Sequence, residues 1–166
     1  MYLTYESIQA NEFLKASEDY ASGASVLFLG MVRDHSEGRN PMIPAHSQEL
    51  DAPVFAGRKV LYLEYEAYEE MAERLLQELI QRAFAAWPLE EVRLLHRLGR
   101  VELGEIAVAI DVRSAHRDEA YQASRFLIEE IKHKVPIWKK EYFADGTSEW
   151  SKCAGHGLYA DVPTSA

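Results

Sequence analysis

The sequence predicts an α+β fold, in which two main helices pack on a largely antiparallel mixed sheet. Several short segments have alternating or continuous apolar residues, which is typical of strands. Two longer segments carry apolar residues at three- and four-residue spacing, which is typical of amphipathic helices. A chain of 166 residues with 48% hydrophobic content can bury one full core. We therefore expect a single domain over residues 1–153.

The first part of the chain contains two predicted strands and a brief helix. Residues 1–6 are expected to form a short edge strand, and Ser7 is suited to cap the helix after it. Residues 24–32 form an apolar run with β-branched members, which predicts a buried strand that ends beside Arg33. An arginine at a strand end can bind an anion. The alternative is a salt bridge to one of the 27 acidic residues.

A long polar segment follows Arg33. Residues 34–58 contain three prolines and two glycines and show no sustained period. Loops longer than ~12–15 residues within a compact domain tend to be lids, binding loops or disordered segments. We expect either a lid over an anion site or an insertion without a role. At the other end of the chain, residues 154–166 are expected to form a mobile tail.

The middle of the chain has the clearest periodicity. Residues 59–67 alternate as a half-buried strand does, and the helix after them keeps its three- and four-residue spacing until Pro88. Residues 92–98 and 106–113 are predicted strands that are joined through Gly99 and a polar turn. Because these two strands are neighbours in sequence, antiparallel pairing is favoured.

Four lysines fall within residues 132–140 of a chain whose net charge is −9. Exposed charge in soluble domains usually mixes both signs, so this segment predicts a site for an anionic ligand. Pro136 is expected to end the preceding helix, and residues 137–143 alternate as a strand. Lys132 and Lys139 then belong to two elements that meet at a bend. The alternative is that the late-helix lysines complement the helix dipole, worth roughly 0.3–1 kcal/mol.

A second basic group lies at the start of the predicted helix 118–134. A helix start exposes unpaired N–H groups and the positive end of the dipole, so His116 and Arg117 there predict a phosphate-binding site. The alternative is that Arg117 pairs with Asp118 and Glu119. About fifteen residues of helix span roughly 22 Å. One ligand could therefore touch both basic groups only with help from a loop or a second subunit.

Composition argues against several classes of protein. Cys153 is the only cysteine and the histidines show no close ligand spacing, so neither an internal disulfide nor a metal or other cofactor is expected. The acidic balance argues against a general nucleic-acid binder. There is no apolar run of about 18 residues and no charged-then-apolar leader, which predicts a cytoplasmic protein.

Five motifs occur in a fixed order, and together they resemble one protein family. They are Phe28-x-Gly30-x-Val32-Arg33-x-His35, Trp87-Pro88-Leu89, His96-Arg97-x-Gly99, Ser114-Ala115-His116-Arg117 and Lys132-x-x-x-Pro136-x-Trp138-Lys139-Lys140-Glu141. This set resembles the large catalytic subunit of molybdopterin synthase, over about residues 20–153. The combination of the last two motifs is the specific signal, because any one of the five alone would be weak.

The resemblance implies a hammerhead-like α+β fold and a sulfur transferase of molybdenum cofactor biosynthesis. Such an enzyme converts cyclic pyranopterin monophosphate (precursor Z) to molybdopterin. Its sulfur comes from the C-terminal glycine thiocarboxylate of a small ubiquitin-like subunit. The resemblance also implies a central homodimer of the large subunit within a heterotetramer.

Individual residues receive roles from the same resemblance. Lys132 and Lys139 would be catalytic and would also contact the substrate. The other substrate-binding positions would be Arg33, His116 and Arg117 at the phosphate, with Met31, Val32, Lys140 and Glu141. Met31 stands where family members often have a basic residue.

Two rival functions use the same basic cluster. A non-catalytic module could bind a phosphorylated metabolite or an acidic peptide there, and Lys132→Ala would only weaken its binding. A lysine-dependent Schiff-base enzyme would be trapped with its substrate by borohydride. Neither rival explains the joint set of motifs.

Overall fold

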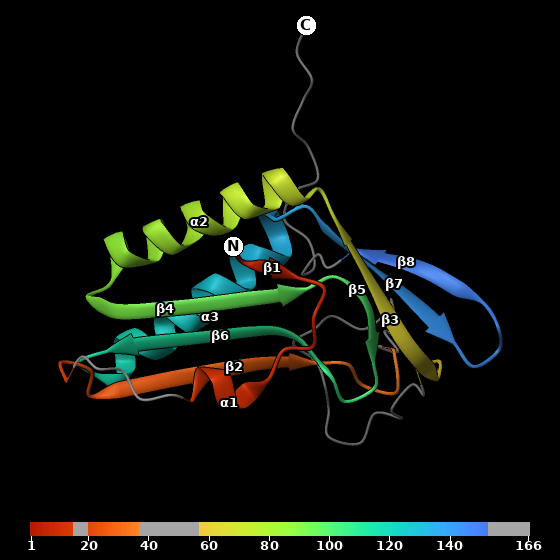
Figure 1. Cartoon of the computed structure of the whole chain (residues 1–166), viewed down its shortest axis with the longest axis horizontal. Helices are drawn as coiled ribbons and strands as arrows, with labels where there is room; N and C mark the ends of the chain where they lie inside the picture. Colours follow the sequence, from red (N-terminus) through yellow and green to blue (C-terminus); the bar gives the residue numbers. More distant parts are fainter. Residues whose placement is uncertain (15–19, 37–56, 153–166) are drawn as a thin grey trace, which may run out of the picture.

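The computed structural model describes residues 1–14, 20–36 and 57–152, whose strands form two four-stranded sheets (Figure 1). The first sheet has the order β1-β4-β6-β2, with β1 Leu3–Thr4, β4 Leu89–Arg97, β6 Ile106–Ser114 and β2 Ala24–Met31. The second has the order β5-β3-β7-β8, with β5 Gly99–Glu102, β3 Val60–Ala67, β7 Ile137–Phe143 and β8 Ser148–Lys152. The helices are α1 Ala10–Phe13, α2 Glu69–Ala86 and α3 Arg117–Lys134. The α+β class is confirmed, but the strands are divided between two sheets.

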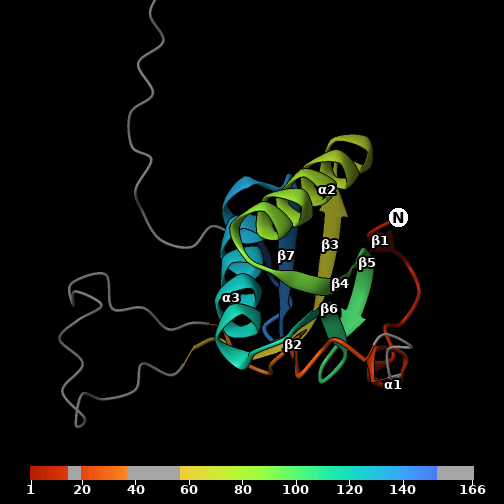
Figure 2. The ribbon, with the colours of Figure 1, turned by 90° about the vertical axis from the view of Figure 1, so that its left-hand side faces the viewer.

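The first sheet is covered on both faces. Its strands pair antiparallel, except that β1 runs parallel to β4. Helix α3 lies against one face and α1 lies on the opposite side (Figure 2). On the α1 side, Phe13 packs with Ile8 and Ala109 in a small apolar cluster. Its central strand β6 is thus buried along almost its whole length.

A junction between β4 and β5 joins the two sheets. Strand β4 ends at Arg97 and β5 begins at Gly99, so the chain changes sheet within two residues. Gly99 has a φ of 73°, in the left-handed region that glycine adopts without a steric penalty. The predicted strands 92–98 and 106–113 do pair antiparallel, as β4 and β6. The segment between them was predicted as a turn alone, and it also contains β5.

Two further predictions need correction, and one strand was missed. Ser7 does not cap α1: Gln9 is the N-cap residue, and the Ser7 hydroxyl donates to Glu105 at 3.4 Å. Strand β2 is only half-buried, because it forms the edge of its sheet. Strand β8 was not predicted, since its sequence Ser-Glu-Trp-Ser-Lys has no apolar alternation.

The helices and β7 agree with the sequence. Helix α2 buries an apolar stripe and ends at Ala86, and the amide of its C-cap residue Trp87 donates to the Ala83 carbonyl. Helix α3 ends at Lys134, before Pro136, as predicted. One apolar core extends between the two sheets, and its largest fully buried members include Leu76, Leu98, Ile110 and Leu127. None of the helices in the described ranges is long and apolar enough to cross a membrane.

The predicted long segment 34–58 is described only at its ends. His35 and Lys59 form an isolated antiparallel bridge. The Ser36 amide donates to the Arg58 carbonyl at 3.0 Å, and the Arg58 amide donates to the Ser36 hydroxyl at 3.0 Å. The two ends of the segment are therefore held together. Residues 37–56, and the predicted tail 154–166, lie outside the described residues.

Candidate functional site

The predicted basic residues fall at opposite ends of α3. His116 is the N-cap residue and Arg117 the first helical residue, whereas Lys132 lies in the last turn. The helix has 18 residues, so its ends are roughly 27 Å apart. Within one chain, the two basic groups form two separate sites.

At the N-terminal end, His116 and Arg117 are exposed and line a pocket of about 450 Å³. Gly23 lies in the pocket wall, where a Cβ would come within 2.3 Å of the Ala115 carbonyl oxygen. Only glycine therefore allows the chain before β2 to approach the start of α3 this closely. The His116 side chain does not cap the helix, and Asp118 also lines the pocket. The pocket thus combines two basic side chains with the positive end of a helix.

Arg33 lies at the other end of the first sheet. In the antiparallel register of β2 and β6, Ala24 pairs with Ser114, whereas Met31 pairs with Ile106. The eight-residue length of β2 separates Arg33 from His116 by roughly 26 Å. The predicted phosphate site of Arg33, His116 and Arg117 is therefore not formed within one chain.

Met31 and Val32 have different surroundings. The Met31 side chain is exposed at the end of β2, whereas the Val32 side chain is buried in the core. The Val32 amide donates to the Glu105 carbonyl, and the Val32 carbonyl accepts from the Gly104 amide, at 3.1 and 2.8 Å. Val32 therefore fixes the end of β2, and its side chain faces the core.

The inner face of β7 carries an ion pair between Lys139 and Glu141. The Lys139 Nζ lies 2.9 Å from the Glu141 Oε1, and the two side chains are 26% and 12% exposed. Their neighbours on the same face, Ile137 and Phe143, are buried in the core. The Lys139 ammonium is thus held at the border between the core and solvent.

The outer face of β7 carries Lys140, which points away from Lys139. Its Nζ lies 5.1 Å from the ring centre of Tyr142 and 5.5 Å from that of Trp150. The Tyr142 hydroxyl donates to Glu64 at 2.7 Å, and this hydrogen bond raises the pKa of Tyr142. Within one chain Lys140 therefore lies on the opposite face of β7 from Lys139 and Glu141, because successive strand residues face opposite sides.

The two lysines in the last turn of α3 have different surroundings. The Lys134 ammonium lies 2.6 Å from Glu130, which also binds Arg82 at 2.8 Å. Hydrogen bonds from Lys134 and Arg82 lower the pKa of Glu130. Lys132 is exposed and has no hydrogen-bond or ion-pair partner in the described part of the chain. Lys132 and Lys139 therefore lie on either side of the bend at Pro136, as predicted.

Comparison with known proteins identifies the family. The family model described as MoaE protein matches residues 3–134. The chain belongs to the MoaE family. Its relatives include the molybdopterin synthase catalytic subunit of Nostoc sp., 35% identical over 149 residues that cover 89% of this chain and 79% of the relative. The protein of the same name from Staphylococcus aureus is 37% identical over 151 residues, covering 91% and 86%.

Solved MoaE-family structures have the same fold. The crystal structure of molybdopterin synthase from Staphylococcus aureus matches with a TM-score of 0.73 and 36% identity, covering 93% of this chain and 96% of that chain. A chain from the complex of subunits 1 and 2 of molybdopterin-converting factor from Helicobacter pylori matches with a TM-score of 0.66 at 20% identity, covering 95% and 93%. At that identity the second likeness shows the fold alone.

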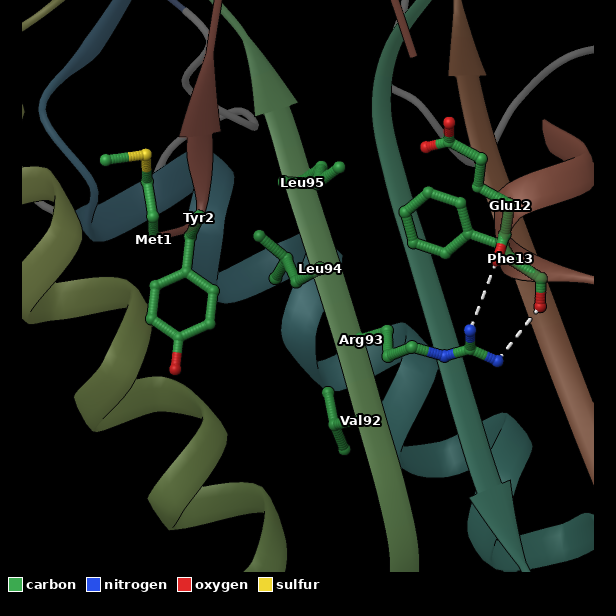
Figure 3. A pocket seen from close by; sticks show the side chains of 8 residues that line it. All are labelled: Met1, Tyr2, Glu12, Phe13, Val92, Arg93, Leu94 and Leu95. Atoms are coloured by element: carbon green, nitrogen blue, oxygen red, sulfur yellow. Dashed lines mark hydrogen bonds between the residues drawn. The ribbon is translucent and has the colours of Figure 1, made fainter. Parts of the chain in front are cut away.

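A further pocket of this MoaE-family chain, of about 360 Å³, lies on the α1 side of the first sheet (Figure 3). It contains none of the predicted site residues. Its basic side chain, Arg93, donates to the carbonyls of Glu12 and Phe13 at 3.2 and 3.1 Å and pairs with Asp111 at 3.0 Å. Arg93 therefore anchors α1 to the sheet. Across residues 1–14, 20–36 and 57–152, no group of three or more acidic, histidine or cysteine side chains could hold a metal ion.

Sequence reasoning missed one residue beside Lys139. Tyr65 is the strand partner of Lys139 in the register of β3 and β7, and its ring is almost fully buried. The alternation of residues 59–67 put Tyr65 on one face of its strand. It could not show which lysine lies opposite, because pairing register is set by contacts between distant segments.

Proposed function

We propose that this protein is the catalytic subunit of a molybdopterin synthase, a sulfur transferase that converts cyclic pyranopterin monophosphate to molybdopterin. The observation that carries the proposal is the pair Lys132 and Lys139, on either side of one bend, in a chain of the MoaE family. Relatives that are 35–37% identical over about nine-tenths of this chain carry that name, which supports the same reaction here.

In this proposal Lys132 and Lys139 act through their charge on an anionic reaction. A thiocarboxylate and a phosphorylated pterin repel one another, and ammonium groups placed between them offset that repulsion and the charge that develops during sulfur transfer. Glu141 holds the Lys139 ammonium in place before the substrate arrives, because the ion pair restricts a flexible side chain. Lys132, which has no partner in the described residues, can move to the substrate.

The proposal includes two partners. The sulfur donor is a small ubiquitin-like subunit whose C-terminal glycine carries the thiocarboxylate. The second partner is another copy of this chain in a central homodimer. The separation of roughly 26 Å between Arg33 and His116 supports this arrangement, since a phosphate could contact both residues only if they came from two chains. Arg33, His116, Arg117 and Met31 are the remaining proposed substrate contacts.

The direct test is reconstitution. The protein is mixed with a thiocarboxylated small subunit and cyclic pyranopterin monophosphate, and molybdopterin formation is measured. The same small subunit with an ordinary C-terminal carboxylate is the matched control. Molybdopterin should form only with the thiocarboxylate. Binding of both components without product would favour a non-catalytic module, and trapping of the substrate by borohydride would favour a Schiff-base enzyme.

A second experiment separates charge from amine chemistry. Arginine keeps the positive charge but does not deprotonate, so it can neither accept a proton nor act as a nucleophile. If the lysines act through charge, Lys132→Arg and Lys139→Arg should each keep most of the single-turnover rate, while the alanine variants lose it. Arginine variants as inactive as the alanine variants, with partner binding intact, would replace the charge role by a reacting amine.

A further inference from the structure

The His96-Arg97-x-Gly99 motif has no role in the function proposed above. In the structure it forms the junction at which β4 passes into β5. The Arg97 Nη1 lies 2.9 Å from Glu105, and Gly99 turns the chain with its positive φ. His96 is buried, and its ring lies against Tyr65 of β3. A motif at the joint between the sheets thus contacts the strand that pairs with β7.

His96 is held in one orientation. Its Nδ1 lies 2.9 Å from the Arg97 carbonyl oxygen, which can only accept, so we assign the proton to Nδ1. Burial lowers the pKa of His96 to about 4, so the ring is neutral near pH 7. The rings of His96 and Tyr65 meet edge to face, with centres 5.1 Å apart and planes at 74°. This arrangement is a preferred aromatic geometry, and it fixes one side of the Tyr65 ring.

The other side of Tyr65 borders Lys139. Directly opposite residues on antiparallel strands project from the same face, with their Cβ atoms about 4.5–5.5 Å apart, and Tyr65 is opposite Lys139. On its other flank Tyr65 pairs with Gly99 of β5. Two residues further along the same face of β3 and β7, Leu63 is opposite Glu141. Lys139 is therefore bordered by Tyr65 along its stem and by Glu141 at its ammonium group.

We infer that Tyr65 is a positioning residue for Lys139, and that His96 keeps the Tyr65 ring in the place where it does this. The lysine stem is flexible, and a rigid wall beside it removes orientations that direct the ammonium away from the reaction. Positioning of this kind raises the rate of the bound complex, whereas substrate affinity changes little. The activity readout of this inference rests on the proposed function, but the geometry and the labelling test below do not.

The first test uses two tyrosines of one strand. Tyr65→Leu removes the ring beside Lys139, and Tyr62→Leu is the matched control, because Tyr62 stacks on Tyr142 on the outer face at 4.4 Å. Tyr65→Leu should lower the single-turnover rate of molybdopterin formation about tenfold to a hundredfold without changing the pterin affinity. In a Lys139→Ala background Tyr65→Leu should have no further effect. An equal loss in Tyr62→Leu would overturn the inference.

The second test does not depend on activity. The folded protein is labelled with a trace of acetic anhydride, and the acetylation rates of Lys139 and Lys140 are compared by mass spectrometry. Tyr65→Leu should raise the acetylation rate of Lys139 relative to Lys140, and Tyr62→Leu should not. An unchanged Lys139 rate in Tyr65→Leu would overturn the inference. If the wild-type protein forms no molybdopterin, the proposed function fails, and the labelling result still decides the role of Tyr65.

Two further substitutions at Tyr65 control for loss of the hydroxyl and for misfolding of Tyr65→Leu. Tyr65→Phe keeps the ring and should raise Lys139 labelling less than Tyr65→Leu does, and a change as large as in Tyr65→Leu would contradict a role for the ring. If Tyr65→Leu does not fold by circular dichroism, Tyr65→Met replaces it, because methionine fills a similar space with a flexible chain. The expected increase in Lys139 labelling is the same, and its absence would contradict the inference.

Discussion

The two sheets hold their charged side chains in different ways. In the first sheet, Asp111 and Arg113 have side chains only 1% and 6% exposed, and both belong to a network that also contains the partly exposed Arg93 and Glu91. Asp111 accepts from Ser25 at 2.6 Å, and from Arg93 and Arg113 at 3.0 Å each. In the second sheet, Lys139 and Glu141 form one pair that remains partly exposed. Asp111 and Arg113 are enclosed in the fold, whereas the Lys139 ammonium can meet a ligand.

This difference follows from which faces are covered. The first sheet has α3 on one face and α1 on the other (Figure 2), so a charge on either face needs protein partners. In the described residues, no helix lies over the outer face of the second sheet, and its Trp138 and Trp150 are exposed (Figure 1). We therefore expect substitutions in the first sheet to change stability, and substitutions in the second sheet to change activity.

The largest expected effect on stability is that of Asp111→Ala. This substitution removes the buried carboxylate that Arg93 and Arg113 share, while Glu91 still lies 3.4 Å from each of them. Breaking a buried ion pair from one side costs about 3–5 kcal/mol, and because Glu91 remains we expect a loss near the lower limit. Urea denaturation should show this loss in the free energy of unfolding. Glu78→Ala, which breaks an exposed pair with Arg74, is the control and should change it by less than about 1 kcal/mol. Equal values for the two variants would show that enclosure in the first sheet has no energetic consequence.

The junction residue His96 should make stability depend on pH. Its pKa is about 4 in the fold against 6.5 in the unfolded chain, so the unfolded chain binds more protons between these values. The free energy of unfolding should therefore fall by on the order of 3 kcal/mol as the pH drops from 6.5 to 4. Thermal unfolding of the wild type and of His96→Phe across this range measures the difference. Parallel pH profiles would contradict burial of a neutral His96.

Gly99→Ala should have the smallest effect of the three, about 1–2 kcal/mol, because a φ of 73° is unfavourable for a residue with a Cβ. Gly99→Asn is the matched control, since asparagine tolerates this region better, and its loss should be smaller. Chemical denaturation of both variants measures the effect. If alanine and asparagine are equally tolerated, the junction between the sheets does not depend on this backbone conformation.

Local patterns predicted much of this fold. The helix limits near Pro88 and Pro136 and the alternation of residues 137–143 were all present in the sequence, because they depend on neighbouring residues. The alternation itself already placed Lys139 and Lys140 on opposite faces, although the motif resemblance gave both of them a role in substrate binding.

The division into two sheets could not be predicted in the same way. It depends on pairing between distant segments, and β5 and β8 are short strands without a clear apolar period. The separation of Arg33 from His116 and the pairing of Tyr65 with Lys139 likewise follow from register. Sequence motifs therefore supplied candidate residues, and the sheet registers decided which of them lie together.

The most direct test of the account compares Lys139→Ala with Lys140→Ala in single-turnover sulfur transfer. The two lysines are adjacent, belong to the same strand and lie on opposite faces. Loss of an ammonium group that stabilises developing charge should lower the rate about 10²–10³-fold in Lys139→Ala, and Lys140→Ala should stay near the wild-type rate. Wild-type rates in Lys139→Ala, or an equal loss in both variants, would contradict the assignment of the reaction to the inner face of the second sheet.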